Sequence, residues 1–325
     1  MHVLLLTDSW PDTSGPMLPQ RVADIAASAW GDAQPADAVT SIAVGDGGPR
    51  SADALSGPVT AVGDVEAVAA GQSLFLRPGG SAPRWNPGHL SDALFALARD
   101  ASRGERTVVV PVGDADLAGD ATAVWGESFT HARQALRQLP LEVLVTSSRP
   151  LLGLKGMSAA VRDRREKDHA LALAAQEQER RWSEIAREVD AALPRPLVGP
   201  ARLSDVPGSG AAHGLAYCLG AVGARVLPAS ARLARAAGAS DLSADLVIAI
   251  TGSLTPHTLD EGVTHAASAI AGARGVPCAV LGVELGVGKR DLMAAGVASA
   301  HEGQVGADAL AEHVRRVART WSPAR

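Results

Sequence analysis

The chain has 325 residues, of which 46% are hydrophobic and 20% are charged, and its formal net charge is −5. At about 100–200 residues per domain, this length predicts two domains, and the composition is typical of a globular protein with a hydrophobic core. The negative charge argues against a nucleic-acid-binding surface, which needs an excess of basic residues. The two cysteines, Cys218 and Cys278, lie among apolar residues, so we expect buried free thiols in a reducing compartment.

The sequence has no recognisable targeting or membrane segment. The apolar run at 2–7 stops at Asp8 and has no basic flank. No apolar run approaches the about 20 residues that a membrane span needs. These features predict a cytoplasmic protein without membrane contact.

The first elements alternate between strand and helix. Residues 2–7 form a continuous Val/Leu run, which is typical of a buried parallel strand. Residues 16–30 place apolar side chains at helical spacing, and 41–44 are a second short strand. Strand, helix and strand at this spacing predict a βαβ unit.

The middle of the chain is less regular. It is expected to contain a Gly/Pro-rich loop or short hairpin at 71–88, a helix at 89–102, strands at 107–112 and 141–147, a charged helical stretch at 158–192 and a linker at 197–207.

Alternation returns near the end of the chain, with strands at 244–251 and 277–283 and helices at 258–274 and 305–321. The predicted fold class is therefore α/β, with a Rossmann-like parallel-sheet domain built from both chain ends, 1–60 and 229–325. A second α/β domain, residues 61–228, is expected to be inserted between them.

Two short acidic segments follow predicted strands. Ligands of doubly wound sheets collect beyond the carboxyl ends of strands, so Asp8 and Ser9 can lie at a ligand site, or can cap a turn. In GDGG at 45–48, Gly47 and Gly48 can turn backbone N–H groups towards an anion, with Asp46 beside them. Taken alone, GDGG is more typical of a tight turn.

The segment VPGSGAAHGLA at 206–216 places three glycines ahead of a helical stretch. Glycines at a helix N-terminus can expose N–H groups to phosphate, but they also permit close packing, which this spacing slightly favours. The segment is neither a GxGxxG fingerprint nor a P-loop.

A further glycine segment, ITGSLTPHT at 250–258, follows a strand and contains Thr251 and Gly252. His213, His257 and His265 lack the companions that a metal site needs, so no protein-bound metal site is expected.

Six segments occur in a recognisable order: TDSWP at 7–11, VGDGGP at 44–49, VTSSRPLLGLKG at 145–156, PGSGAAHGLAYCLGAVGARVLP at 207–228, ADLVIAITGSLTPHTL at 244–259 and GVPCAVLGV at 275–283. In this order the sequence resembles the glycerate kinase family, the type I bacterial enzymes that phosphorylate D-glycerate from ATP. PLLG and PGSGAAHGL with its trailing GARVLP are the most specific segments. The resemblance implies a discontinuous two-domain architecture.

Several motifs differ from the family pattern, so the chain resembles a diverged member. Pro11 stands where the family motif D-S-F-K has lysine, and Pro49-Arg50 replace E-G-T. The family loop G-G-S-A-T-N-D-G-G corresponds to VPVGDADLAGD at 110–120. Thr146 and Arg149 replace the Asp and Asn of C-D-V-T-N, and Thr255 replaces the Asp of E-G-R-L-D.

The resemblance implies a kinase that uses ATP and Mg²⁺ to phosphorylate glycerate or a similar small hydroxy acid. Asp8 and Asp46 would face an interdomain cleft, where either can hold Mg²⁺ or orient the hydroxyl. The implied substrate- and phosphate-binding residues are Ser9, Gly47, Gly48, Arg149, Gly208, Ser209, Gly210, Thr251 and Gly252. Because the charged motif positions are altered, a catalytically impaired homologue that binds metabolites or proteins is the alternative.

Overall fold

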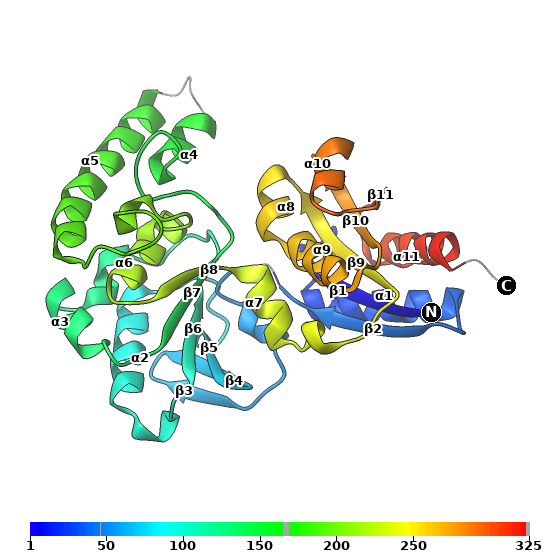
Figure 1. Ribbon diagram of the computed structural model, residues 1–325, viewed down its shortest axis with the longest axis horizontal. Coiled ribbons are helices and arrows are strands. Elements are labelled where there is room, and N and C mark those ends of the chain that lie inside the picture. The colour runs from blue at the N-terminus through cyan, green and yellow to red at the C-terminus, as the bar shows by residue number, and fades with distance from the viewer. Residues whose placement is uncertain (46, 165–168, 323–325) are drawn as a thin grey trace. The chain divides into compact units, whose positions relative to one another are not determined.

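The computed structural model describes residues 1–45, 47–164 and 169–322. The chain folds into two compact units, labelled element by element in Figure 1. The first unit comprises Met1–Gly47, Asp53–Ser56 and Ala229–Arg325, and the second comprises Gly48–Ala52 and Gly57–Pro228. The predicted α/β fold class, with one parallel sheet made from both chain ends, is confirmed.

The first unit contains a five-stranded parallel sheet in the order β11-β10-β9-β1-β2. Its strands are β1 (His2–Thr7), β2 (Ala38–Ala43), β9 (Leu246–Leu254), β10 (Cys278–Leu285) and β11 (Ser299–Glu302). Although more than two hundred residues separate them in the chain, β1 and β9 are direct neighbours, with Val3 opposite Leu246. The two chain ends therefore build one sheet.

Helices cover both faces of this sheet, which explains the apolar run in β1. On one face, α1 (Pro19–Ala33) and α11 (Ala307–Trp321) pack against alternate strand residues such as Val3 and Leu5. On the other, α9 (Val263–Arg274) contacts β1, β9 and β10. A strand covered on both faces has no polar side, so its sequence does not alternate.

The remaining helices of this unit are α7 (Ala229–Ala236), α8 (Pro256–Glu261) and α10 (Lys289–Ala294). The helix predicted at 258–274 is interrupted at Gly262, whose extended backbone ends α8 and begins α9.

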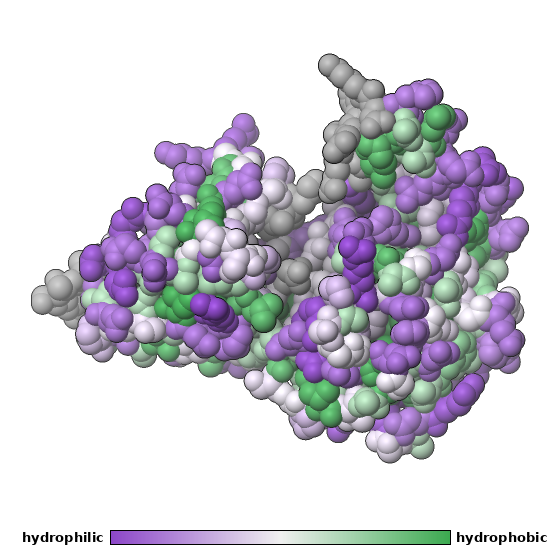
Figure 2. All heavy atoms as spheres, turned by 180° about the vertical axis from the view of Figure 1, so that it is seen from behind, coloured by the Kyte–Doolittle hydropathy of each residue, from purple (hydrophilic) through white to green (hydrophobic). Residues whose placement is uncertain are grey.

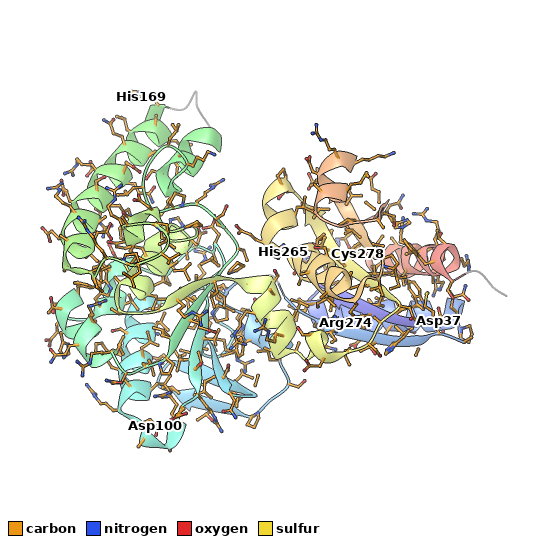
Figure 3. The ribbon with its side chains drawn as sticks, in the orientation of Figure 1. Asp37, Asp100, His169, His265, Arg274 and Cys278 are labelled. Atoms are coloured by element: carbon orange, nitrogen blue, oxygen red, sulfur yellow. The ribbon has the colours of Figure 1, made fainter. Side chains whose placement is uncertain are left out.

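A buried carboxylate ties the two ends of the first unit together (Figure 3). The side chain of Asp37 is 4% exposed and accepts hydrogen bonds from Trp30 Nε1 at 3.0 Å, from the Met1 α-amino group at 3.1 Å and from Ser322 Oγ at 3.1 Å. Burial by itself would raise the pKa of Asp37, but these hydrogen bonds outweigh it, and the pKa is lowered.

The second unit contains a six-stranded mixed sheet in the order β3-β4-β5-β6-β7-β8. Its strands are β3 (Val59–Val62), β4 (Val65–Ala70), β5 (Ser73–Pro78), β6 (Thr107–Pro111), β7 (Leu141–Val145) and β8 (Arg225–Pro228). The first three pair antiparallel, and β5 to β8 pair parallel.

The sequence expectation of a loop or short hairpin at 71–88 captured only part of this sheet. Gly71, with a φ of +57°, turns the chain between β4 and β5, and β4 also pairs with β3. Because the segment is rich in glycine and proline beyond residue 78, its sequence did not predict the apolar strand with which it starts.

The helices of the second unit are α2 (Pro87–Arg99), α3 (Phe129–Ala135), α4 (Met157–Arg164), α5 (His169–Ala192) and α6 (Leu215–Ala221). Alternate residues of the central strands, such as Val108, Val110 and Val143, pack with these helices in one core. Most of the predicted helical stretch at 158–192 falls in α4 and α5, which flank 165–168, outside the described residues.

Polar residues dominate the face shown in Figure 2, and hydrophobic residues appear there in small separate patches. In the described part of the chain, no helix combines the length and apolarity needed to cross a bilayer. Both cysteines are buried free thiols, as the sequence predicts.

Candidate functional site

The carboxyl edge of the first sheet has the geometry of a ligand site. From β1 the chain crosses through α1 to β2 on one side, whereas β9 leads to β10 and β11 on the other. The direction of the crossovers therefore reverses between β1 and β9. In open α/β sheets, ligands bind at such a switch point, beyond the carboxyl ends of the strands.

Four of the residues predicted from the sequence lie together at this point. The Asp8 N–H donates to the Ile250 carbonyl at 2.8 Å, and the Gly252 N–H donates to the Ser9 carbonyl at 2.9 Å. These bonds continue the β1–β9 pairing beyond Thr7, so Asp8 and Ser9 lie beside Thr251 and Gly252.

The approach at Gly252 is close. A Cβ at this position would lie 2.8 Å from Pro11 Cδ, so a larger residue would displace the loop after β1. Pro11, which replaces the lysine of the resembled motif, packs at this contact. The Asp8 side chain is half-buried, and its Oδ1 accepts a hydrogen bond from the Ser9 N–H at 2.6 Å.

Two further predicted residues, Gly47 and Gly48, lie in the turn after β2. Gly45 and Gly47 have φ values of +82° and +81°, a backbone region that favours glycine. Gly48 is buried, and its carbonyl accepts a hydrogen bond from Ser51 N–H at 3.0 Å. Asp46, the second predicted catalytic residue, lies outside the described residues.

In the second unit, the glycines of the 207–214 segment allow close packing. Gly208 has a φ of +84°, and a Cβ there would lie 2.7 Å from Val145 Cγ2. A Cβ at Gly210 would lie 2.5 Å from the Pro150 carbonyl oxygen. The segment therefore rests directly on β7 and on the loop that follows it.

Hydrogen bonds hold this segment to the same loop. Ser209 is fully buried, and its Oγ accepts from the Leu151 N–H at 2.9 Å and donates to the Ser204 carbonyl at 3.3 Å. The Gly210 N–H donates to the Arg149 carbonyl at 3.0 Å, and the Ser209 N–H donates to the Val206 carbonyl at 3.0 Å. In this conformation both N–H groups already have acceptors.

A pocket of about 700 Å³ lies in the second unit, between the loop after β6 and helix α5. We call it the α5 pocket. Its lining residues are Arg84, Asp116, Leu117, Gly119, Asp120, Ala121, Val161, Ala174, Glu177, Gln178, Arg181, Trp182 and His213. It combines charged and apolar side chains, and its lining is more polar than the predominantly apolar lining of most small-molecule sites.

Ion pairs organise the charges of the α5 pocket. Asp116 Oδ1 lies 3.0 Å from His213 Nε2, and Asp116 Oδ2 lies 3.9 Å from Arg84 Nη2. The hydrogen bond to His213, followed by the positive charges of His213 and Arg84, lowers the pKa of Asp116. Partial burial would raise the pKa of Asp120, but hydrogen bonds from Thr122 and Arg181 outweigh it and lower that pKa.

The backbone beside the pocket is strained. Ala212 and His213 have φ values of +50° and +53°, and such a left-handed conformation costs an ordinary L-residue about 1–2 kcal/mol. The Ala212 N–H donates to Asp114 Oδ1 at 3.1 Å, which fixes the turn to the loop after β6. Such strain often occurs at ligand sites.

Sequence reasoning missed Arg84, Asp116, Asp120 and Arg181. The available signal was the run of aspartates at 114, 116 and 120, directly after a predicted strand. In the family comparison this loop differs by the glycines it lacks, and that difference gives no indication of its aspartates. Arg84 and Arg181 lie far from it in the chain, and only the fold brings them to it.

Comparison with known proteins identifies the family. The glycerate kinase family model matches residues 105–322, about two thirds of the chain. The chain belongs to the glycerate kinase family. The matched residues include the loop after β6, α5 and the 207–214 segment, as well as Thr251 and Gly252. Asp8 and Ser9 precede them.

The structural comparison extends the similarity of fold to the whole chain. A crystal structure described as "putative glycerate kinase 2 from Salmonella typhimurium LT2" aligns with a TM-score of 0.64 and 17% sequence identity. The alignment covers 99% of this chain and 97% of that one. No curated protein sequence matches this member of the glycerate kinase family.

Proposed function

We propose that this protein catalyses ATP-dependent phosphoryl transfer to a hydroxyl of D-glycerate or a similar small hydroxy acid. The observation that carries the proposal is its membership of the glycerate kinase family over residues 105–322. The grouping of Asp8, Ser9, Thr251 and Gly252 at the switch point of a parallel sheet supports it, because small-molecule sites occur there.

Asp8 is the proposed catalytic residue at this edge, and its carboxylate orients the acceptor hydroxyl or ligates Mg²⁺. Asp46, from the GDGG segment of the sequence, is assigned the same pair of roles. The proposed substrate- and phosphate-binding residues are Ser9, Gly47, Gly48, Arg149, Gly208, Ser209, Gly210, Thr251 and Gly252. Of these, Arg149 supplies the positive charge, and its side chain is half-buried. To bind phosphate, the Ser209 and Gly210 N–H groups would exchange their present carbonyl acceptors, Val206 and Arg149, for the ligand.

The donor set fits a magnesium ion carried by the nucleotide. Mg²⁺ is usually bound by one or two carboxylates together with substrate phosphates, and less often by a protein cage. Among the described residues there is no cluster of three or more histidine, cysteine or acidic side chains arranged for a metal. A single carboxylate such as Asp8 is a suitable protein ligand, and the ion would neutralise phosphate charge during transfer.

The test is turnover of purified protein with Mg-ATP and D-glycerate, followed as ADP release. The Asp8→Asn variant is expected to lose about 100-fold or more in kcat, because it removes the group that orients or activates the hydroxyl. The matched control is Asp24→Asn, which changes an exposed carboxylate on α1. Full activity in Asp8→Asn would refute the assignment of Asp8.

The second candidate function is a non-catalytic relative that binds a metabolite. Pro11 in place of a lysine, packed against Gly252, favours it, because that position cannot supply a cation. This candidate predicts no ADP release, but a thermal shift with glycerate or nucleotide. A ligand at ten times its Kd adds roughly 1.4 kcal/mol to the free energy of unfolding.

A further inference from the structure

The α5 pocket is larger than a glycerate molecule needs. Small-molecule pockets occupy about 300–1,000 Å³, and this pocket, at about 700 Å³, lies well inside that range. A three-carbon acid would leave most of it filled with water. The pocket therefore suits a larger ligand than the proposed acceptor.

The charges of the pocket do not suit a polyphosphate. Its lining carries two arginines and one histidine against three acids, so it has no positive excess. Each acid also has a partner: Asp116 pairs with Arg84 and His213, and Asp120 pairs with Arg181. Glu177 pairs with Arg180 at 2.5 Å. A triphosphate placed here would find no positive excess and would have to compete with these acids for the same cations, which is unfavourable.

The same carboxylates suit a neutral ligand that is rich in hydrogen-bond donors. An ionised carboxylate only accepts hydrogen bonds, and each oxygen can accept more than one. Asp116 and Asp120 lie on one short loop and are about half exposed or more, with side-chain exposures of 66% and 43%. Hydroxyl and amino groups of a ligand can therefore reach them without breaking a buried ion pair.

The rest of the lining provides apolar surface and flat cationic groups. Leu117 and Ala121 come from the loop side, and Val161, Ala174 and Trp182 come from α4 and α5. Guanidinium groups stack on aromatic rings, and Arg84 and Arg181 are both about half exposed at the pocket. A planar heteroaromatic ring can thus lie between aliphatic side chains and a guanidinium plane.

We propose that the α5 pocket binds the nucleoside part of the nucleotide, with the ring against Val161 and Ala174 and the ribose hydroxyls on Asp116 and Asp120. The choice of a nucleoside rests on the proposed ATP-dependent function. The phosphates then extend out of the pocket, away from its acids. The pocket is a subsite that recognises the phosphoryl donor. None of its lining residues is among the proposed phosphate-binding residues.

A zwitterion such as a free amino acid would also find charges of both signs here. It would, however, fill only a small part of about 700 Å³ and would leave the apolar wall unused. The nucleoside uses the volume, the apolar wall and the acceptors together, and so it is the better match.

The test is calorimetric binding of adenosine, which has no phosphates and does not depend on turnover. Adenosine is expected to bind the wild-type protein, and Ala174→Trp is expected to weaken binding by about tenfold or more by filling the pocket. Ala174 is exposed on α5, so the larger side chain does not disturb the core. The matched control, Ala191→Trp, changes an exposed alanine on the same helix outside the pocket lining, and it should bind adenosine as the wild type does.

If the protein turns over ATP, Ala174→Trp should raise the KM for ATP by about tenfold or more while the KM for D-glycerate stays unchanged. Adenosine binding that is lost only in Ala174→Trp, without any turnover, would uphold the pocket and overturn the proposed kinase activity. Absence of adenosine binding, binding that Ala174→Trp leaves intact, or an unchanged KM for ATP would overturn the pocket proposal.

Discussion

Gly214 connects the strained segment of the second unit to the wall of the α5 pocket. Its φ of +88° and ψ of 4° are left-handed. A Cβ at this position would lie 2.5 Å from Trp182 Cζ2 and 2.7 Å from Cη2. Trp182 is 3% exposed, so its ring cannot move aside into solvent. Gly214→Ala should therefore strain the backbone and displace a packed ring.

The two costs can be estimated separately. A left-handed alanine costs about 1–2 kcal/mol, and overpacking a buried contact costs about 1–3 kcal/mol. The sum of about 2–5 kcal/mol should lower Tm by roughly 4–20 °C, at about 2–4 °C per kcal/mol for 150–250 residues. Thermal and urea unfolding, followed by far-ultraviolet circular dichroism and tryptophan fluorescence, measure this loss of stability.

Gly63→Ala is the matched control in the same unit. Gly63 has a φ of +63°, but no other atom lies within 4 Å of its added Cβ. This variant should lose only the stability that the left-handed backbone costs. If Gly214→Ala loses no more stability than Gly63→Ala, the steric part of the reasoning is wrong.

The remaining predictions concern hydrogen bonds to two carboxylates, those of Asp37 and Asp190. Because the pKa of folded Asp37 is lowered from 3.8, its stabilising effect is present above that pH and is lost as pH falls through the folded pKa. Asp37→Asn should thus lower the free energy of unfolding by about 1–3 kcal/mol at pH 7. In urea unfolding measured over a series of pH values, the variant should lose less stability on acidification than the wild type does. Equal losses in the two proteins would count against this account. Tyr217, whose pKa is raised by burial and by the charge of Asp190, donates to Asp190 Oδ1 at 3.0 Å. Tyr217→Phe should cost about 1–2 kcal/mol in urea unfolding, and a cost near zero would show that the hydrogen bond contributes nothing net.

Much of the first unit could be predicted because its elements carry strong local patterns. The continuous apolar runs of β1, β9 and β10 mark strands covered on both faces, and the periodic apolar residues of α1 and α11 mark helices that cover them. Elements with weaker patterns were not predicted. For example, β3 and β8 of the second unit are four residues long, and neither carries a distinctive pattern.

The candidate site was only partly predictable. The grouping of Asp8 and Ser9 with Thr251 and Gly252 followed from the general rule that carboxyl ends of parallel strands meet at one edge. The structural role of Ser209 could not be predicted in this way, because only the packing of the chain brings Leu151 and Ser204 to its side chain.

The sequence by itself determined the α/β class and the order of the family's motifs, since periodicity and motif order are local properties of the chain. Only the tertiary structure decided which polar groups meet. Arg84, Asp116, Arg181 and His213 come from separate parts of the chain and carry no shared pattern. Their pairing depends on how strands and helices pack, and the distances between charges are set by that packing alone.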